Sequence, residues 1–145
     1  LSEAGLPCIA DPGSKIVEYA HNFQIDVIPL VGPSSILLAL MASGLNGQNF
    51  AFTGYLPIRK SERIRTIKKL DELTRRTTQT QIFMEAPYRN NQLIEALLKT
   101  CKNNTRLCIA SNITLTNSEI KTKTISEWKQ TKINIHKKPA IFLIG

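Results

Sequence analysis

Three short stretches of the chain combine glycine or proline with hydroxyl or carboxylate side chains, which are groups that bind small ligands. They are Ser2 to Gly13, Val31-Gly32-Pro33-Ser34-Ser35, and Glu85-Ala86-Pro87-Tyr88-Arg89. In the second stretch, Gly32 lets a ligand approach the backbone closely, and Pro33 suits the first turn of a helix. Ser34 and Ser35 place hydroxyls beside the free N–H groups of a helix N-terminus, which favours an anionic or hydrogen-bonding ligand. A well-capped connection between a strand and a helix explains the same residues.

Several kinds of catalytic site find no support in the sequence. No residues suggest a nucleophile triad, a metal cluster or a Walker loop, and neither Ser34 nor Ser35 lies in a Gly-x-Ser-x-Gly setting. The three cysteines are odd in number and include no Cys-x-x-Cys pair, which argues against a disulfide framework or a zinc site. We expect them to pack as small apolar side chains in a reducing cytoplasm. We expect no metal.

The elements that must position the first two stretches alternate between helix and strand. Asp11-Pro12-Gly13-Ser14 predicts a helix start, with Asp11 as a possible cap, and apolar spacing continues the helix to about Asn22. Residues 25–31 predict a strand, and residues 36–44 a buried helix closed by Gly44. This alternation favours a parallel sheet, in which ligands bind at the C-terminal ends of the strands. Both glycine turns would lie at that edge.

The second half predicts another α/β region with a mixed sheet. Strands are expected at 50–57, 80–85, 106–112, 119–124 and 140–144, and helices at 61–76, 88–100 and 124–129. The last helix carries Trp128, which we assign to the core. The apolar residues of the first of these helices would face the core, and its cations would line the outer side: Arg59, Lys60, Arg63, Arg65, Lys68 and Lys69.

The charge of the chain changes abruptly near residue 58. Residues 1–58 hold one basic and four acidic side chains, whereas residues 59–145 hold 18 basic and seven acidic ones. We place a domain boundary here, giving the end of a first domain at residues 1–56 and a second domain at residues 57–145. The basic second part favours an anionic partner, with nucleic acid the first candidate. A solvated basic surface is the alternative. No apolar run approaches the ~20 residues of a membrane span, and no secretory signal opens the chain, so we expect a cytoplasmic protein.

The runs Ser2 to Gly13, Pro29 to Ser35 and Phe83 to Arg89, which contain the three stretches, together resemble the motifs of the tetrapyrrole methylase family. Its members are S-adenosylmethionine-dependent class III methyltransferases. The nearest branch is the small-subunit ribosomal RNA 2′-O-ribose methyltransferase I group, and the closing run Pro139 to Gly145 matches as well. The resemblance implies two α/β domains with S-adenosyl-L-methionine in the cleft between them, and a homodimer. It also implies that the family's opening strand and glycine loop precede Leu1, so that this chain is the latter part of a longer protein.

The resemblance assigns cofactor-contacting positions, while it leaves the catalytic base unknown. Glu3, Asp11 and Glu85 are the nearby carboxylates, but Asp11 also suits a helix cap and Glu85 could pair with Arg89. The implied cofactor positions are Ala4, Gly5, Leu6, Ile9, Ser34, Ser35, Glu85, Asn112, Ile113 and Ala140.

The function implied is methyl transfer from S-adenosylmethionine to a ribose of small-subunit ribosomal RNA. One departure bears on the substrate, because the RNA branch usually carries an Arg-Glu-Leu-Thr-Lys-like run where this chain has Ser111 to Thr116. A tetrapyrrole-precursor methyltransferase is the alternative enzyme. Its substrate is also polyanionic, so charge alone does not separate the two. A cofactor- or RNA-binding module without turnover is the alternative of another class.

Overall fold

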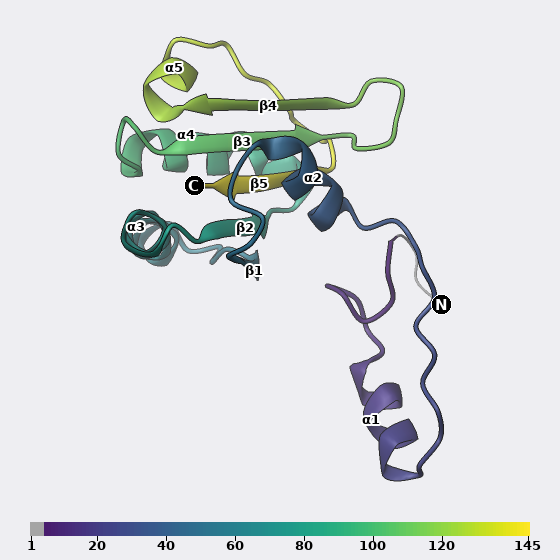
Figure 1. The fold of residues 1–145 in the computed structure, drawn as a ribbon. Helices are drawn as coiled ribbons and strands as arrows, with labels where there is room; N and C mark the ends of the chain where they lie inside the picture. Colours follow the sequence, from purple (N-terminus) through teal and green to yellow (C-terminus); the bar gives the residue numbers. More distant parts are fainter. Residues whose placement is uncertain (1–4) are drawn as a thin grey trace. The chain divides into compact units, whose positions relative to one another are not determined.

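The computed structural model describes residues 5–145, and its contacts divide the chain into two compact units after Ser35. We call residues 5–35 the first unit and residues 36–145 the second unit. Figure 1 shows a single helix with extended chain in the first unit, and a sheet with helices around it in the second. Each unit is described by itself.

The first unit contains one helix, α1 (Ser14–Asn22), and its start differs from the prediction. Gly13 is the N-cap residue, with φ of 140°, and no side chain caps the helix, so the assignment of Asp11 as cap is wrong. A β-carbon at Gly13 would lie 2.8 Å from Cys8 Sγ, so only glycine fits there without a rearrangement. No residue of α1 is buried.

The predicted strand at residues 25–31 does not form. A strand needs a neighbour that accepts and donates its backbone hydrogen bonds, and no segment within residues 5–35 pairs with this one. Its apolar side chains are exposed, with Leu30 at 83% and Ile28 at 78%. The parallel first sheet therefore stays a prediction.

The second unit is built on a five-stranded mixed sheet in the order β1-β2-β5-β3-β4. Its strands are β1 (Phe50–Tyr55), β2 (Thr80–Met84), β3 (Arg106–Ser111), β4 (Glu119–Thr124) and β5 (Ala140–Ile144). β1 and β2 are parallel, while β5 is antiparallel to both β2 and β3, and β3 is antiparallel to β4. All five strands were predicted, and the mixed α/β fold class is confirmed.

Helices cover both faces of this sheet. One face packs α2 (Ser35–Ser43), through Ala39 and Leu40, against Ile82 and Leu143. The other packs α3 (Lys60–Thr77), α4 (Asn90–Thr100) and α5 (Ile125–Lys129) against alternate residues of the same strands, Phe83 and Phe142 among them. A 3₁₀ turn, η1 (Pro87–Arg89), joins β2 to α4. Because successive strand residues point to opposite faces, both apolar layers come from continuous apolar runs.

Two details of the second unit bear on the sequence predictions. Arg63 was expected on the outer side of its helix but is buried at 7% exposure, since it lies one turn before the fully buried Ile67 on the inner face of α3. Trp128 is buried as expected and donates from Nε1 to the Leu107 carbonyl at 2.7 Å. The boundary at residues 56/57 stays a prediction, while the structure pairs β1 before it with β2 after it.

Candidate functional site

Three of the predicted site residues of the second unit meet at one edge of its sheet. β2 and β3 both run antiparallel to β5, so their C-terminal ends lie where β5 begins. Glu85 follows Met84, which pairs with Ile141, and Ala140 pairs with Ser111. The Asn112 N–H donates to the Pro139 carbonyl at 2.9 Å. Glu85, Asn112 and Ala140 therefore share this edge, which we call the site edge.

Glu85 is held at the site edge by a charged hydrogen-bond network. Its side chain is fully buried, and Oε1 accepts from Arg89 Nε at 2.9 Å and from Arg89 Nη2 at 2.7 Å. The Ala86 N–H donates to the same oxygen at 2.8 Å. The hydrogen bond from Arg89 to this carboxylate raises the pKa of Arg89 above its ordinary value. The pairing of Glu85 with Arg89, one of the two interpretations of the sequence, is thus present.

The second oxygen of the Glu85 carboxylate has no partner among the residues that the structure describes. Oε2 is buried and accepts no hydrogen bond from any of residues 5–145. A buried carboxylate oxygen without a donor is costly, because burial removes the water that would otherwise solvate it. The arrangement therefore suits a ligand that brings a hydroxyl or amino donor to this oxygen.

Beside Glu85 the site edge also offers an amide and apolar surface. Asn112 is buried in a left-handed conformation, with φ of 51°, and its carbonyl accepts from Leu115 N at 2.9 Å in a turn. Asparagine tolerates this conformation better than most residues. Ile113 and Ala140 are half-buried and supply apolar contact area. A carboxylate, an amide and small apolar side chains are together suited to a nucleoside-like ligand.

The exposed ring of Tyr88 borders the Glu85 network. Arg89 Nη1 donates to Tyr88 Oη at 2.6 Å, and Arg89 Cζ lies 4.8 Å from the centroid of the Tyr88 ring. This cation–π contact holds an aromatic face at the surface, where it is 59% exposed. The site edge therefore carries an aromatic surface next to its buried carboxylate.

The predicted site residues of the first unit also fall into neighbouring loops. A β-carbon at Gly32 would lie 2.9 Å from Leu6 Cδ2, and one at Gly5, whose φ is 78°, would lie 3.7 Å from the Pro33 carbonyl oxygen. The two glycine turns are thus side by side, as the sequence predicts. Ile9 is 51% exposed, Ser34 is buried and Ser35 is exposed at the start of α2. Ala4 and Glu3 lie outside the described residues.

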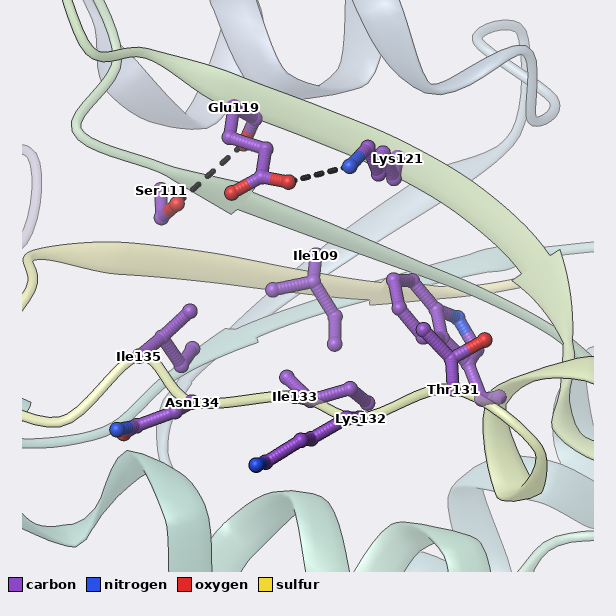
Figure 2. A pocket seen from close by; sticks show the side chains of 10 residues that line it. Ile109, Ser111, Glu119, Lys121, Thr131, Lys132, Ile133, Asn134 and Ile135 are labelled. Atoms are coloured by element: carbon purple, nitrogen blue, oxygen red, sulfur yellow. Dashed lines mark hydrogen bonds and ion pairs between the residues drawn. The ribbon is translucent and has the colours of Figure 1, made fainter.

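Sequence reasoning missed a pocket between β4 and the segment that follows α5 (Figure 2). The alternation of β4 could have indicated that Glu119 and Lys121 share a face. Nothing in the sequence indicated that residues 131–135 would lie opposite them. Ten side chains line the pocket: Ile109, Ser111, Glu119, Lys121, Trp128, Thr131, Lys132, Ile133, Asn134 and Ile135.

Two structural features of the described chain concern other classes of site. Among residues 5–145, no three His, Cys, Asp or Glu side chains gather in a group that could hold a metal ion. None of the helices in the same range is long and apolar enough to cross a membrane. Cys101 and Cys108 are buried, as expected, and Cys8 is half-buried.

Comparison of this chain with known protein families identifies the family to which it belongs. Residues 1–129 match the model of the tetrapyrrole (corrin/porphyrin) methylases. The chain belongs to this family. The resemblance drawn from the three sequence stretches is thereby confirmed, and the remaining comparisons describe particular members.

Two curated relatives of this tetrapyrrole methylase carry the name ribosomal RNA small subunit methyltransferase I. The protein of Buchnera aphidicola subsp. Acyrthosiphon pisum is 34% identical over 100% of this chain and 51% of its own length. That of Mesorhizobium japonicum is 34% identical over 86% of this chain and 41% of its own length. The chain thus spans about half the length of the relatives it matches.

A solved structure shows the same fold. The uroporphyrin-III C-methyltransferase of Thermus thermophilus, crystallised with S-adenosyl homocysteine, matches with a TM-score of 0.54. The match covers 97% of this chain and 62% of that one at 12% sequence identity. At this identity the likeness concerns the fold.

Proposed function

We propose that the protein transfers a methyl group from S-adenosyl-L-methionine to a 2′-hydroxyl of small-subunit ribosomal RNA. Two relatives, each 34% identical, carry the name of a small-subunit ribosomal RNA methyltransferase, and the proposed substrate is based on this observation. The cofactor follows from the family and from the S-adenosyl homocysteine in the related solved structure. Since the chain spans about half of these relatives, the activity is proposed for the full-length protein.

The residues of the site edge fit this cofactor. The unpartnered Glu85 Oε2 provides a buried acceptor for a ribose hydroxyl or an amino group. Asn112 provides an amide, and Ile113 and Ala140 provide apolar contact area for a ring. Glu85, Asn112, Ile113 and Ala140 would hold the cofactor from the second unit. For the first unit, the family resemblance proposes Gly5, Leu6, Ile9, Ser34 and Ser35, with Ala4, as cofactor positions.

The cofactor supplies the difficult chemistry, because its sulfonium already makes the methyl group electrophilic. The protein's task is to orient the accepting hydroxyl and to exclude competing water. Arg89 fixes the Glu85 carboxylate through two hydrogen bonds to Oε1, so that Oε2 is oriented before any ligand arrives. We assign Glu85 to binding, and no residue to the role of base.

The outer face of α3 fits an RNA phosphate backbone. Lys60, Arg65, Lys68 and Lys69 form no ion pair within residues 5–145, and the last three are four or fewer residues apart on one helix. Unpaired cations in a row bind phosphates without selecting sequence, and such binding weakens steeply as salt is added. We further propose a cytoplasmic homodimer, on the strength of the family resemblance.

The proposal is tested with the full-length protein. Methyl-labelled S-adenosylmethionine and small ribosomal subunits from cells lacking the gene are incubated with it, and the label is located. Label on an RNA ribose is the expected result. Glu85→Gln should reduce the label, whereas Glu95→Gln, on the exposed face of α4, serves as the control.

Two other results would redirect the proposal. Label on a tetrapyrrole precursor but not on RNA would identify the protein as a tetrapyrrole-precursor methyltransferase. Cofactor binding without transfer to either substrate would indicate a binding module.

A further inference from the structure

The pocket between β4 and residues 131–135 combines an apolar floor with a polar rim. Its volume is about 170 Å³. Ile109 and Trp128 line the pocket and are buried, and we call them its apolar floor. Ile133 and Ile135 form the wall opposite β4 (Figure 2). An apolar cavity of about 150 Å³ accommodates one benzene ring. The pocket therefore has room for one six-membered ring.

The rim of this pocket carries more positive than negative charge. Lys121 pairs with Glu119, and the pKa of Glu119 is held below its ordinary value by that hydrogen bond and by the charges of Lys121 and Lys138. Lys132 lines the pocket as well and forms no ion pair within the described residues. Two lysines, Lys121 and Lys132, and one carboxylate, Glu119, thus line the pocket, so the charge of its rim favours an anionic group.

The wall opposite β4 is fixed by two neighbouring asparagines at the start of α4. Asn90 is fully buried, and its Nδ2 donates to the Lys138 carbonyl at 2.7 Å. Asn91 Oδ1 accepts from the Ile135 N–H at 3.1 Å, and its Nδ2 donates to Asn134 Oδ1 at 3.0 Å. A segment without secondary structure is thereby held in place, so the pocket exists before a ligand binds.

One end of the pocket lies beside the site edge. Ser111 and Glu119, two of its lining residues, pair with each other, and Ser111 also pairs with Ala140 of the site edge. A strand of RNA whose nucleotides pass the site edge would reach the pocket within the same unit. This step rests on the proposed RNA substrate.

We propose that this pocket binds one unstacked pyrimidine base of single-stranded RNA, with an adjoining phosphate at Lys121 and Lys132. The apolar floor contacts the ring, and the volume of the pocket is closer to that needed by one six-membered ring than by the two fused rings of a purine. Ser111 and Asn134 offer hydrogen-bonding groups beside the ring. The lysines of the rim would contact the phosphate, and the buried apolar side chains of the floor would contact the base.

The test measures binding of short RNA by the full-length protein, using fluorescence anisotropy at fixed salt. One labelled pentamer carries a single uridine among four abasic ribose phosphates, and the other is fully abasic, so the two have equal charge. The uridine strand should bind about tenfold more tightly, in keeping with the usual contribution of one stacked base. A strand with adenosine in place of uridine should bind more weakly than the uridine strand.

Matched variants locate the binding. Lys132→Glu should weaken binding of the uridine strand at least several-fold more than Lys129→Glu, which makes the same charge change three residues away on α5 outside the pocket. Ile133→Phe fills the pocket, so it should bring the affinity for the uridine strand down to that for the abasic strand. Unchanged melting temperatures show that the variants fold.

Three results would overturn the inference. Equal binding of the uridine and abasic strands would show that the pocket does not bind the base. Equal effects of the two lysine variants would show that the phosphate does not bind at Lys132. Uridine monophosphate binding as tightly as the pentamer would make the ligand a free nucleotide. If any of these occurs while the wild-type protein methylates ribosomal RNA, the pocket inference fails alone. Absence of both RNA binding and methyl transfer would overturn the proposed function with it.

Discussion

The two units carry similar apolar sequence but bury it very differently. Phe23 in the first unit is 73% exposed, and Val31 is fully exposed. Phe83 and Phe142 in the second unit are fully buried, with stacked rings whose centroids are 6.2 Å apart. The difference lies in neighbours, since the second unit brings five strands together and the first pairs none among residues 5–35. The apolar pattern of a segment thus determines which of its side chains can be buried. Whether they are buried depends on the other helices and strands that pack against them.

The largest contrast expected between the units is in stability. Phe83→Ala should lower the free energy of unfolding by about 3–5 kcal/mol, because it opens a cavity in a closed core. Phe23→Ala should change it by less than about 0.5 kcal/mol, since an exposed side chain loses little. Urea unfolding of this chain, followed by circular dichroism, measures both. Equal effects would mean that the first unit has a core of its own.

A second contrast concerns ligand binding at the site edge. Glu85→Gln should weaken S-adenosyl homocysteine binding to the full-length protein about tenfold, since a charge-assisted hydrogen bond is replaced by a weaker one. Isothermal titration calorimetry measures the affinity, with Glu95→Gln as the matched exposed control. Unchanged affinity in the Glu85 variant would remove this residue from the site.

The starts of two helices provide a smaller contrast. Thr124 caps α5 in a capping box with Glu127, so Thr124→Ala should cost about 1 kcal/mol. Asp11→Ala should cost less than about 0.5 kcal/mol, because no side chain caps α1. Thermal unfolding compares the two. A larger loss of stability for the Asp11 variant than for the Thr124 variant would indicate that Asp11 does cap α1.

The capping box also gives a pH dependence with a defined sign. Hydrogen bonds from Thr124 lower the pKa of Glu127 from its ordinary value near 4.5. The stabilisation is therefore fully present above the unfolded-state pKa and is lost as pH falls through the lower folded-state value. The difference between wild type and Thr124→Ala should shrink on acidification below pH 4.5. A difference that grows there would contradict this account.

The last contrast concerns the reactivity of the cysteine thiols and involves no difference in the free energy of unfolding. Burial raises the pKa of Cys101 to about 12, and burial also raises that of Cys108. Since only the thiolate reacts, both should resist iodoacetamide at pH 8 while the half-buried Cys8 is alkylated. Mass spectrometry of timed samples identifies the modified residue. Early alkylation of Cys101 would show that the core opens readily.

The sequence by itself determined most of the second unit. Apolar spacing predicted the five strands and the long helices, because the periods of strand and helix are local properties of the chain. It also placed Glu85, Asn112 and Ala140 in loops or at strand ends that turned out to meet at one edge. Their roles in cofactor binding stay predictions that the titration above can test.

Only the tertiary structure decided the features that depend on distant neighbours. The strand at residues 25–31 needed a partner that residues 5–35 do not provide, and Arg63 was drawn inward by the packing of α3 against the sheet. The pocket at residues 131–135 arises from segments far apart in the chain, and the burial that leaves Glu85 Oε2 without a partner among the described residues depends on the packing around it. Hydrogen-bond partners and cavities are set by which surfaces meet in three dimensions, and local sequence pattern does not encode that choice.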